Sequence, residues 1–374
     1  MKKLILSLLA MILLFSFTAC KQEDDVPAIR KSKIEHETEF GGVYIKTTIE
    51  EFNRKGFMFG DSVDVSFSDG QLLEDVPYYN GYYVESGELI LVGYPGYPYI
   101  KICRNYGPDI WETMSLKDGL TATVTLREAG KYLDTQMARD LHYKDDRSQF
   151  PSDEVFANFR MVTVGDIREN IMYRSASPCD NQHNRAPYSD ELIEEAGIRF
   201  VFNAADTAEK IEKYMAEPSY DSPYYRALYE EGKVLPLGMT MNFESADFRK
   251  KIVQGFREII ANEGPYLIHC TEGKDRTGFV CMMIEILCHA TYDEIASDYM
   301  ITYDNYYQVN EKGDKYKYDL ILDSYLNDML RMLAQDKEAD VRNLDLEECG
   351  RSYLRASGMS DEEIDALVNR FTQE

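Results

Sequence analysis

Ten consecutive residues of this 374-residue chain, 269–278, have the types and spacing for nucleophilic chemistry on an anion. They read His-Cys-Thr-Glu-Gly-Lys-Asp-Arg-Thr-Gly and place five residues between Cys270 and Arg276. If those five residues form a loop that leads into a helix, their N–H groups point inward and the helix N-terminus adds partial positive charge. Such a loop would bind a tetrahedral dianion and favour the thiolate form of Cys270.

The side chains of this segment extend the same chemistry. The planar guanidinium of Arg276 grips two oxygens of an anion at once, which a lysine cannot do. Thr277 is placed to donate a hydrogen bond to the thiolate, and the glycines allow a tight loop and close helix packing. The alternative is that Cys270 is an ordinary buried cysteine beside a surface turn. The complete ten-residue motif argues against this alternative. The residues expected to bind the anion are Thr271, Glu272, Gly273, Lys274, Asp275 and Gly278.

The elements around this segment are predicted from apolar spacing. Residues 265–268 form a short buried strand that leads into the loop, and residues 279–288 are apolar nearly all round, as in a central buried helix. Residues 248–261 have the spacing of an amphipathic helix. Residues 292–374 are expected to be helical, with a capping box beginning at Ser360. Strands that alternate with helices imply a parallel sheet, whose ligand sites lie at the carboxyl ends of its strands.

The string His-Cys-x5-Arg-Thr-Gly, after a strand and before a helix, resembles the phosphate-binding loop of cysteine-dependent phosphatases, the protein tyrosine phosphatase superfamily. The part of this motif with the sequence Gly-Lys-Asp-Arg-Thr-Gly is most similar to the bacterial tyrosine/serine phosphatase-like branch. Some members of that branch also accept phosphoinositides. Three further segments resemble that branch: Asn158-Phe159-Arg160, Met172-Tyr173-Arg174-Ser175-Ala176 and Gly197-Ile198-Arg199-Phe200-Val201-Phe202.

This resemblance implies an α/β phosphatase domain, with a central, mostly parallel sheet flanked by helices, that hydrolyses phosphomonoesters through a phosphocysteine on Cys270. Arg276 and the loop amides would stabilise the developing charge. His269 would orient the loop and support a low cysteine pKa, and Lys274 could favour substrates with more than one phosphate. The resemblance implies no cofactor, and the five histidines form no metal-ligand pattern.

The general acid of this reaction is the least certain residue of the site. Where the family commonly has Asp-Leu-Arg, this chain has Asn203-Ala204-Ala205, and an aspartate appears only at Asp206. An acid is needed because the leaving oxygen must be protonated as the P–O bond breaks. Asp206 ranks first for this role, Asp275 second and Asp247 third. Each could equally be a solvated carboxylate or a helix cap.

The preceding part of the chain has a different pattern. Short alternating or apolar stretches separated by turn residues, from about residue 26 to 149, predict a small all-β domain, an antiparallel sandwich or barrel. Seven tyrosines lie between positions 78 and 99 and would form either a binding face or, as we favour, half-buried packing. The polar residues 144–149 suggest a domain boundary, with a β-rich domain and tether over 20–150 and the phosphatase domain over 151–374.

Residues 1–19 have the pattern of a signal sequence. A basic start precedes an apolar run that is too short for a membrane-spanning helix. Phe17-Thr18-Ala19-Cys20 resembles a bacterial lipoprotein processing site. This resemblance implies that Cys20 carries a lipid that anchors the protein in the cell envelope, with the outer membrane as the expected membrane. A plain signal peptide that is cut nearby is the alternative. The net charge of −25 argues against nucleic-acid binding. Of the seven cysteines, Cys281 and Cys288 lie within an apolar helical pattern, which predicts that both are packed in the core.

Several substrates fit the site predicted here. Phosphotyrosine or phosphoserine proteins, phosphoinositides and inositol polyphosphates present the same terminal group. Pocket depth would decide between them, and a loop over residues 176–190 could set it, or be an ordinary surface loop; its polar members are Asn181, His183, Asn184 and Arg185. A hypothesis of another class is a surface-anchored binding protein with a degenerate phosphatase domain. The Asn203 departure favours it, and the intact Cys270 and Arg276 argue against it.

Overall fold

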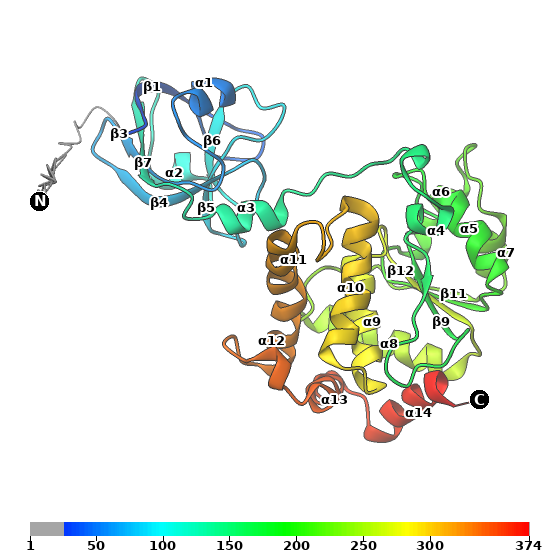
Figure 1. The fold of residues 1–374 in the computed structure, drawn as a ribbon. Helices are drawn as coiled ribbons and strands as arrows, with labels where there is room; N and C mark the ends of the chain where they lie inside the picture. The colour runs from blue at the N-terminus through cyan, green and yellow to red at the C-terminus, as the bar shows by residue number, and fades with distance from the viewer. Residues whose placement is uncertain (1–25, 374) are drawn as a thin grey trace, which may run out of the picture. The chain divides into compact units, whose positions relative to one another are not determined.

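The computed structural model describes residues 26–373, which form two compact units that divide between Gln136 and Met137 (Figure 1). The polar segment 144–149, placed at a domain boundary from the sequence, therefore belongs to the second unit. The predicted signal sequence and Cys20 lie outside the described residues. Within residues 26–373, no helix has the length and apolar character needed to cross a bilayer.

The first unit is built on a closed barrel of seven strands. In barrel order they are β1 (Ala28–His36), β2 (Val43–Ile45), β6 (Ile100–Arg104), β5 (Leu89–Val92), β4 (Leu72–Tyr79), β3 (Ser62–Phe67) and β7 (Thr121–Glu128). The pairing of β4 with β5 is parallel and the other pairings are antiparallel. The two alternatives left open by the sequence are thus decided in favour of a barrel, which leaves no unpaired sheet edge.

Alternating apolar residues fill this barrel, as the period of a strand requires. Val63, Val65 and Phe67 of β3 are buried and belong to its core. Of the seven tyrosines, Tyr78 and Tyr79 are buried, and most of the others are half-buried and pack on one another. The unit also contains helices that the all-β prediction missed: α1 (Ile49–Arg54) and α2 (Ile110–Thr113), while α3 (Leu133–Arg139) spans the division between the units.

The second unit contains a five-stranded sheet in the order β11 (Val234–Pro236), β10 (Phe200–Asn203), β12 (Tyr266–His269), β9 (Met172–Ser175) and β8 (Arg160–Met161). β8 runs antiparallel to β9, and the other three pairings are parallel. In the register of the sheet, His269 is opposite Asn203 on one side and Ser175 on the other. The carboxyl ends of β10, β12 and β9 therefore meet at the start of the candidate loop.

Helices cover both faces of this sheet. Leu267 of β12 packs in a cluster with residues of α5 (Ala186–Glu195), α6 (Ala208–Met215) and α7 (Pro223–Glu230). Its neighbour Ile268 packs in a second cluster with α8 (Ala246–Ala261), α9 (Asp275–Leu287) and the C-terminal helices. Because successive strand residues point to opposite faces, β12 contributes to both cores. Every residue of α9 from Thr277 to Leu287 is buried, which confirms the predicted central helix.

The remaining helices lie mostly in the C-terminal third of the chain. They are α4 (Asp153–Phe156), α10 (Tyr292–Tyr307), α11 (Lys315–Ile321), a π-helical segment (Leu322–Asn327), α12 (Asp328–Ala334), α13 (Leu346–Ser357) and α14 (Asp361–Thr372), with 3₁₀ turns at Arg147–Gln149 and Val341–Asn343. The predicted capping box of the last helix is present between Ser360 and Glu363. The six cysteines of the described part are free, and Cys281 and Cys288 are buried as expected.

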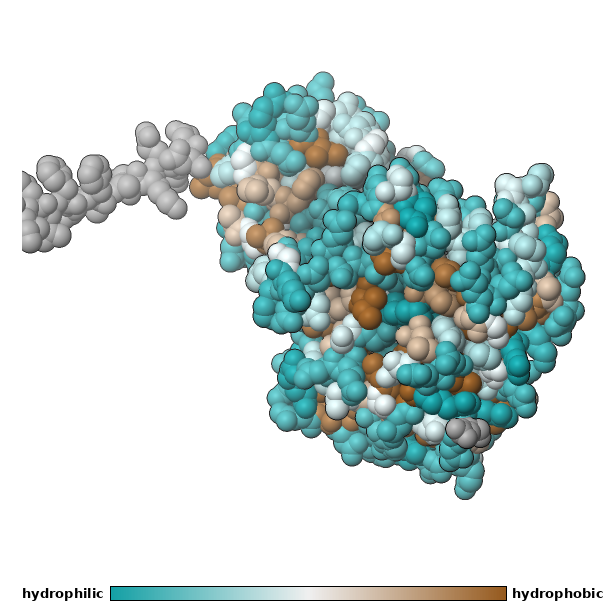
Figure 2. All heavy atoms as spheres, turned by 45° about the vertical axis from the view of Figure 1, so that its right-hand side comes forward, coloured by the Kyte–Doolittle hydropathy of each residue, from teal (hydrophilic) through white to brown (hydrophobic). Residues whose placement is uncertain are grey.

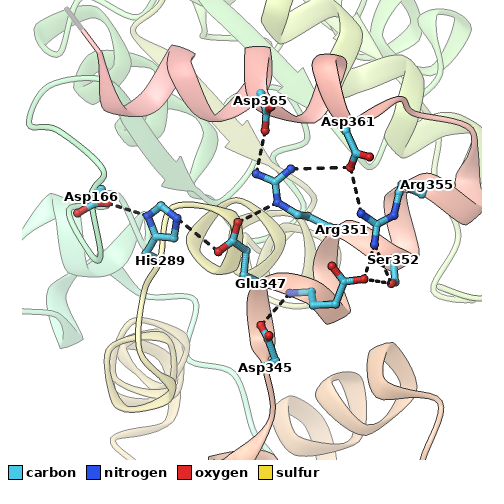
Figure 3. Close-up of polar contacts among 10 residues, drawn as sticks. Asp166, His289, Asp345, Glu347, Arg351, Ser352, Arg355, Asp361 and Asp365 are labelled. Carbon is cyan, nitrogen blue, oxygen red and sulfur yellow. Dashed lines mark hydrogen bonds and ion pairs between the residues drawn. The ribbon is translucent and has the colours of Figure 1, made fainter.

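Ion pairs connect these C-terminal helices at the surface. Arg351 of α13 lies between Glu347 of its own helix and Asp361 and Asp365 of α14 (Figure 3). His289 bridges Asp166 and Glu347 in the same figure. Hydrophilic side chains also predominate on the face of the second unit shown in Figure 2, where apolar atoms form separate patches. Such exposed pairs contribute little stability each.

Candidate active site

The candidate loop connects β12 to α9, as the sequence predicted. β12 ends at His269, and α9 begins at Asp275 without a side-chain cap on its N-terminal N–H groups. Gly273 has a positive φ of +65°, and a Cβ there would lie 2.1 Å from the carbonyl oxygen of Ser175. A Cβ on Gly278 would lie 2.8 Å from the Tyr299 ring. Both positions therefore require glycine for the loop and helix to sit this close to their neighbours.

Cys270 is poised to ionise. Burial of its side chain opposes ionisation, but the positive charge of Arg276 and hydrogen bonding from the side chain and N–H of Thr277 outweigh this effect and lower the pKa of Cys270. Among residues 26–373, the buried Thr277 hydroxyl has no bonded oxygen or nitrogen partner, so it is available to the sulfur. The arrangement stabilises a thiolate at the N-terminus of α9.

Arg276 is held over the loop by two hydrogen bonds. Its Nη1 donates to the carbonyl oxygen of Met239 at 3.2 Å, and its Nη2 donates to the Thr271 hydroxyl at 3.3 Å. Its Nε is buried and has no hydrogen-bond partner among the described residues. A buried guanidinium N–H is costly to leave unpaired, so this donor is available for a bound anion.

His269 is buried directly before the nucleophile. Its Nδ1 lies 3.1 Å from the carbonyl oxygen of Cys270, which can only accept, so Nδ1 donates. Burial lowers the pKa of His269 to about 4, so the ring is neutral at pH 7. This hydrogen bond joins the ring to the backbone at the start of the loop. However, a neutral ring cannot stabilise the thiolate by its charge, and the low cysteine pKa comes instead from Arg276 and Thr277.

A buried polar cluster supports the loop from behind. Arg174 donates to the carbonyl oxygen of Gly273 at 3.0 Å and to Asp298 at 2.6 Å. Asn158 donates to the same Gly273 oxygen at 3.2 Å, and Arg160 pairs with Asp298 at 2.8 Å. Burial opposes ionisation of Asp298, but Arg160 and Arg174 outweigh it and hold its pKa well below the usual range. Asn158, Arg160 and Arg174 belong to the segments that resemble the family, and their contacts, together with Asp298, fix the loop in place.

Asp206 lies in a closed environment. Its side chain is 0% exposed, and its carboxylate pairs with Lys210 at 2.9 Å and accepts a hydrogen bond from Asn203 at 3.2 Å. A carboxylate enclosed in this way has no open path to the oxygen of a leaving group. This enclosure disfavours Asp206, and its role as the general acid stays a prediction. The i, i+4 spacing of Asp206 and Lys210 was the available signal.

The other two candidate acids are open to solvent. Asp275 opens α9 inside the loop, its side chain is 27% exposed, and its negative charge acts on Cys270. Asp247 lies in the first turn of α8 and pairs with Lys251 at 2.8 Å, which is the helix-terminal role expected of an exposed acid there. Of the three ranked carboxylates, Asp275 has both solvent access and electrostatic contact with the nucleophile.

The loop over residues 176–185 is a packing partner of the segment before α4. Arg185 is buried, and its guanidinium donates to the carbonyl oxygens of Phe156 and Lys144 and to Asp145. The His183 ring stacks on Tyr143 with centroids 4.9 Å apart. The backbone N–H of Ser177 donates to the carbonyl oxygen of Thr271 at 3.0 Å. This loop therefore contacts the site directly, and sequence reasoning missed Tyr143 altogether.

The second unit matches a known protein family. The sequence profile described as the tyrosine phosphatase family matches residues 154–373. The solved structure of TpbA from P. aeruginosa in complex with pTyr is 15% identical, with 51% of this chain and 88% of that chain covered and a TM-score of 0.28. The core catalytic domain of the PP-IP phosphatase SIW14 from S. cerevisiae, in complex with citrate, is 21% identical, with 48% and 91% covered and a TM-score of 0.26. No curated protein matches the chain.

Proposed function

This chain belongs to the tyrosine phosphatase family, and on that premise we propose that it hydrolyses phosphomonoesters through a phosphocysteine formed on Cys270. The observation that carries this proposal is the pairing of a cysteine of lowered pKa with an arginine whose buried Nε–H has no partner among residues 26–373. Both lie on one loop at a helix N-terminus, where a dianion is favoured.

The reaction proceeds in two steps. The Cys270 thiolate attacks phosphorus, an S–P bond forms, and the P–O bond to the leaving group breaks. The leaving oxygen takes a proton from a carboxylic acid. Water then attacks phosphorus and gives its proton to that carboxylate, while the S–P bond breaks and phosphate leaves. Arg276 and the loop N–H groups stabilise the equatorial oxygens in both steps, and Thr277 stabilises the departing thiolate.

Asp275 replaces Asp206 in this scheme as the general acid. It is partly exposed, lies in the loop itself and interacts electrostatically with Cys270. Asp206 has a structural role in this scheme, because it forms the turn after β10 together with Asn203. In this turn, Oδ1 of Asn203 accepts hydrogen bonds from the N–H groups of Ala205 and Asp206.

We favour phosphoproteins as the substrates, which would make the enzyme a protein tyrosine or dual-specificity phosphatase. A phosphoinositide or an inositol polyphosphate is the alternative substrate. The test compares wild type with Cys270→Ser on para-nitrophenyl phosphate, a phosphotyrosine peptide, a phosphoserine peptide and a phosphoinositide. Wild-type turnover of the first substrate, lost in the variant, supports the enzyme. Equal rates in the two proteins would show that the activity is not that of Cys270.

The hypothesis of a degenerate domain loses its sequence argument. It rested on Asn203 standing where the family has an aspartate. Asn203 is buried at the end of β10, and its amide bonds Asp206 and the Tyr225 hydroxyl, which is a structural role. The comparison of wild type and Cys270→Ser also decides this alternative, because a binding protein would show no difference in turnover.

A lipid anchor on Cys20 completes the proposal. It rests on the sequence Phe17-Thr18-Ala19-Cys20, and it would place the enzyme at the bacterial cell envelope, with the outer membrane as the expected site. Expression of the full chain in a Gram-negative host should give a membrane-associated, lipid-modified protein. The matched Cys20→Ala variant should lose that modification, and recovery of unmodified wild type in the soluble fraction would refute the anchor.

A further inference from the structure

The ammonium group of Lys274, inside the anion loop, has four oxygen neighbours. Its Nζ lies 3.4 Å from Glu272 Oε2 and 3.7 Å from Asp275 Oδ2. It also lies 3.4 Å from the Tyr307 hydroxyl and 3.5 Å from the Tyr143 hydroxyl. An ammonium has three N–H donors, and four oxygens already surround this one. Lys274 is therefore already engaged by two carboxylates and two hydroxyls before any substrate binds.

Aromatic rings close around the same group. The rings of Tyr143, Tyr303 and Tyr307 have their centroids 5.7 to 6.0 Å from Nζ. Burial opposes the charge on Lys274, but Asp275, Tyr307 and Glu272 outweigh it and hold its pKa well above the usual range. The lysine is thus permanently charged and already partnered, which argues against the sequence-based expectation that it favours substrates with several phosphates.

Glu272 is fixed beside this lysine by its own contacts. Its carboxylate accepts a hydrogen bond from the Tyr143 hydroxyl, and its backbone carbonyl accepts one from Tyr306 at 2.7 Å. Tyr143 is in turn held by His183, on which it stacks. Arg185 binds the backbone next to it, at the carbonyl oxygen of Lys144. A carboxylate is therefore held in place within the loop that is to bind an anion.

We propose that Glu272, positioned by Tyr143, determines the specificity of this site: it keeps Lys274 engaged and sets a negative charge beside the loop, so that a lone phosphomonoester is selected over ligands with clustered phosphates. The inference rests on the function proposed above and deepens it. It assigns the substrate to phosphorylated side chains or other single phosphomonoesters, and it excludes inositol polyphosphates.

Inorganic phosphate and pyrophosphate are the probes that separate these classes. Both present one phosphoryl group to the loop, but pyrophosphate carries a second one, which the proposal places near Glu272 and Lys274. Binding is measured by calorimetry on the full chain with the Cys270→Ser substitution, which cannot form the phosphocysteine. Glu272→Gln removes the charge and keeps the size of the side chain. If the Glu272 charge repels the second phosphoryl group as proposed, pyrophosphate should bind about tenfold more tightly to this variant, and phosphate binding should change by less than about threefold.

Two further variants control this result. Tyr143→Phe removes only the hydroxyl that holds Glu272, and it should shift the pyrophosphate to phosphate ratio in the same direction by a smaller factor. Glu311→Gln removes one exposed charge of the same unit, paired with Lys315 and not with Lys274, and should leave the ratio unchanged. If Glu272→Gln lowers the melting temperature strongly, the Tyr143→Phe ratio decides the question.

The outcomes separate this inference from the proposed function. An unchanged ratio in Glu272→Gln and in Tyr143→Phe, or wild-type binding of pyrophosphate far tighter than of phosphate, would overturn the inference. Selective binding of phosphate that depends on Glu272 supports it even if wild type hydrolyses no ester, a result that would count against the proposed function alone.

Discussion

At the scale of single residues, the reactivity of Cys270 depends on two neighbours whose effects outweigh burial. A thiol in an apolar site would stay protonated. The charge of Arg276 and the hydrogen bonds from Thr277 reverse that tendency and lower its pKa below the usual 9.0. Because the thiolate is the nucleophile, the enzyme should remain reactive at pH values where an ordinary cysteine is protonated.

Thr277→Val tests this balance. The substitution removes the hydroxyl and leaves the backbone N–H, so the pKa of Cys270 should rise and its thiolate fraction at pH 6 should fall. We expect alkylation of Cys270 by iodoacetamide at pH 6 to slow by about three- to tenfold, with less effect at pH 9, where the thiolate dominates in both proteins. A rate profile that is the same for both proteins across this pH range would contradict the role assigned to Thr277.

Asp275→Asn tests the general acid. Phenyl phosphate has a poor leaving group that needs protonation, whereas para-nitrophenyl phosphate needs little help. The variant should lose about 100-fold in kcat with the first and much less with the second. Asp206→Asn is the matched control and should show no dependence on the leaving group. The opposite pattern in the two variants would return the acid role to Asp206.

At the scale of elements, the position of the loop depends on a neighbouring strand and helix. Arg174 of β9 and Asp298 of α10 form a buried ion pair, and Arg174 also bonds the Gly273 carbonyl. Strand β9, helix α10 and the loop are thereby joined at one point. A change in this pair should disturb both stability and catalysis, although neither residue touches the substrate.

Asp298→Asn measures that dependence. It removes the carboxylate that pairs with both Arg160 and Arg174 in their buried site, which should cost about 3–5 kcal/mol of unfolding free energy. Arg355→Ala, which breaks the exposed pairs with Glu348 and Asp361, should lower the unfolding free energy much less, because water and salt screen exposed pairs. Urea unfolding of the two variants measures both unfolding free energies. Similar decreases in the two variants would mean that the buried pair stabilises the fold no more than an exposed pair does.

The sequence predicted the elements whose signals are local. The apolar run before Cys270 and the run after Gly278 define β12 and α9 with no knowledge of the rest of the fold. Tyr143 could not be found in this way, because its partner Glu272 lies 129 residues further along the chain. The same holds for the division between the units, since residues 144–149 are polar like a linker yet are fixed by Arg185.

At the scale of the whole molecule, the chain consists of two units that each have a hydrophobic core of their own. A unit with its own core can fold by itself. The position of the division therefore decides which fragment should be active. It falls before Tyr143 and Asp145, so these residues belong with the loop that they support.

Two truncations test this division. A fragment that begins at Met137 should fold cooperatively and retain the activity of the full chain on para-nitrophenyl phosphate. A fragment that begins at Pro151, close to the boundary suggested by the sequence, lacks the partners of Glu272 and Arg185 and should melt several degrees lower. Equal stability of the two fragments would show that residues 137–150 do not support the site.

The contrast between Cys270 and the other thiols has a consequence for oxidation. Burial raises the pKa of Cys103 to about 11 and that of Cys288 to about 12, and it raises those of Cys179, Cys281 and Cys349 as well. Peroxide attacks thiolates, so within the described residues it should convert Cys270 alone to a sulfenic acid. At the cell-envelope location proposed above, glutathione would not restore this thiol, so oxidation of Cys270 would inactivate the enzyme.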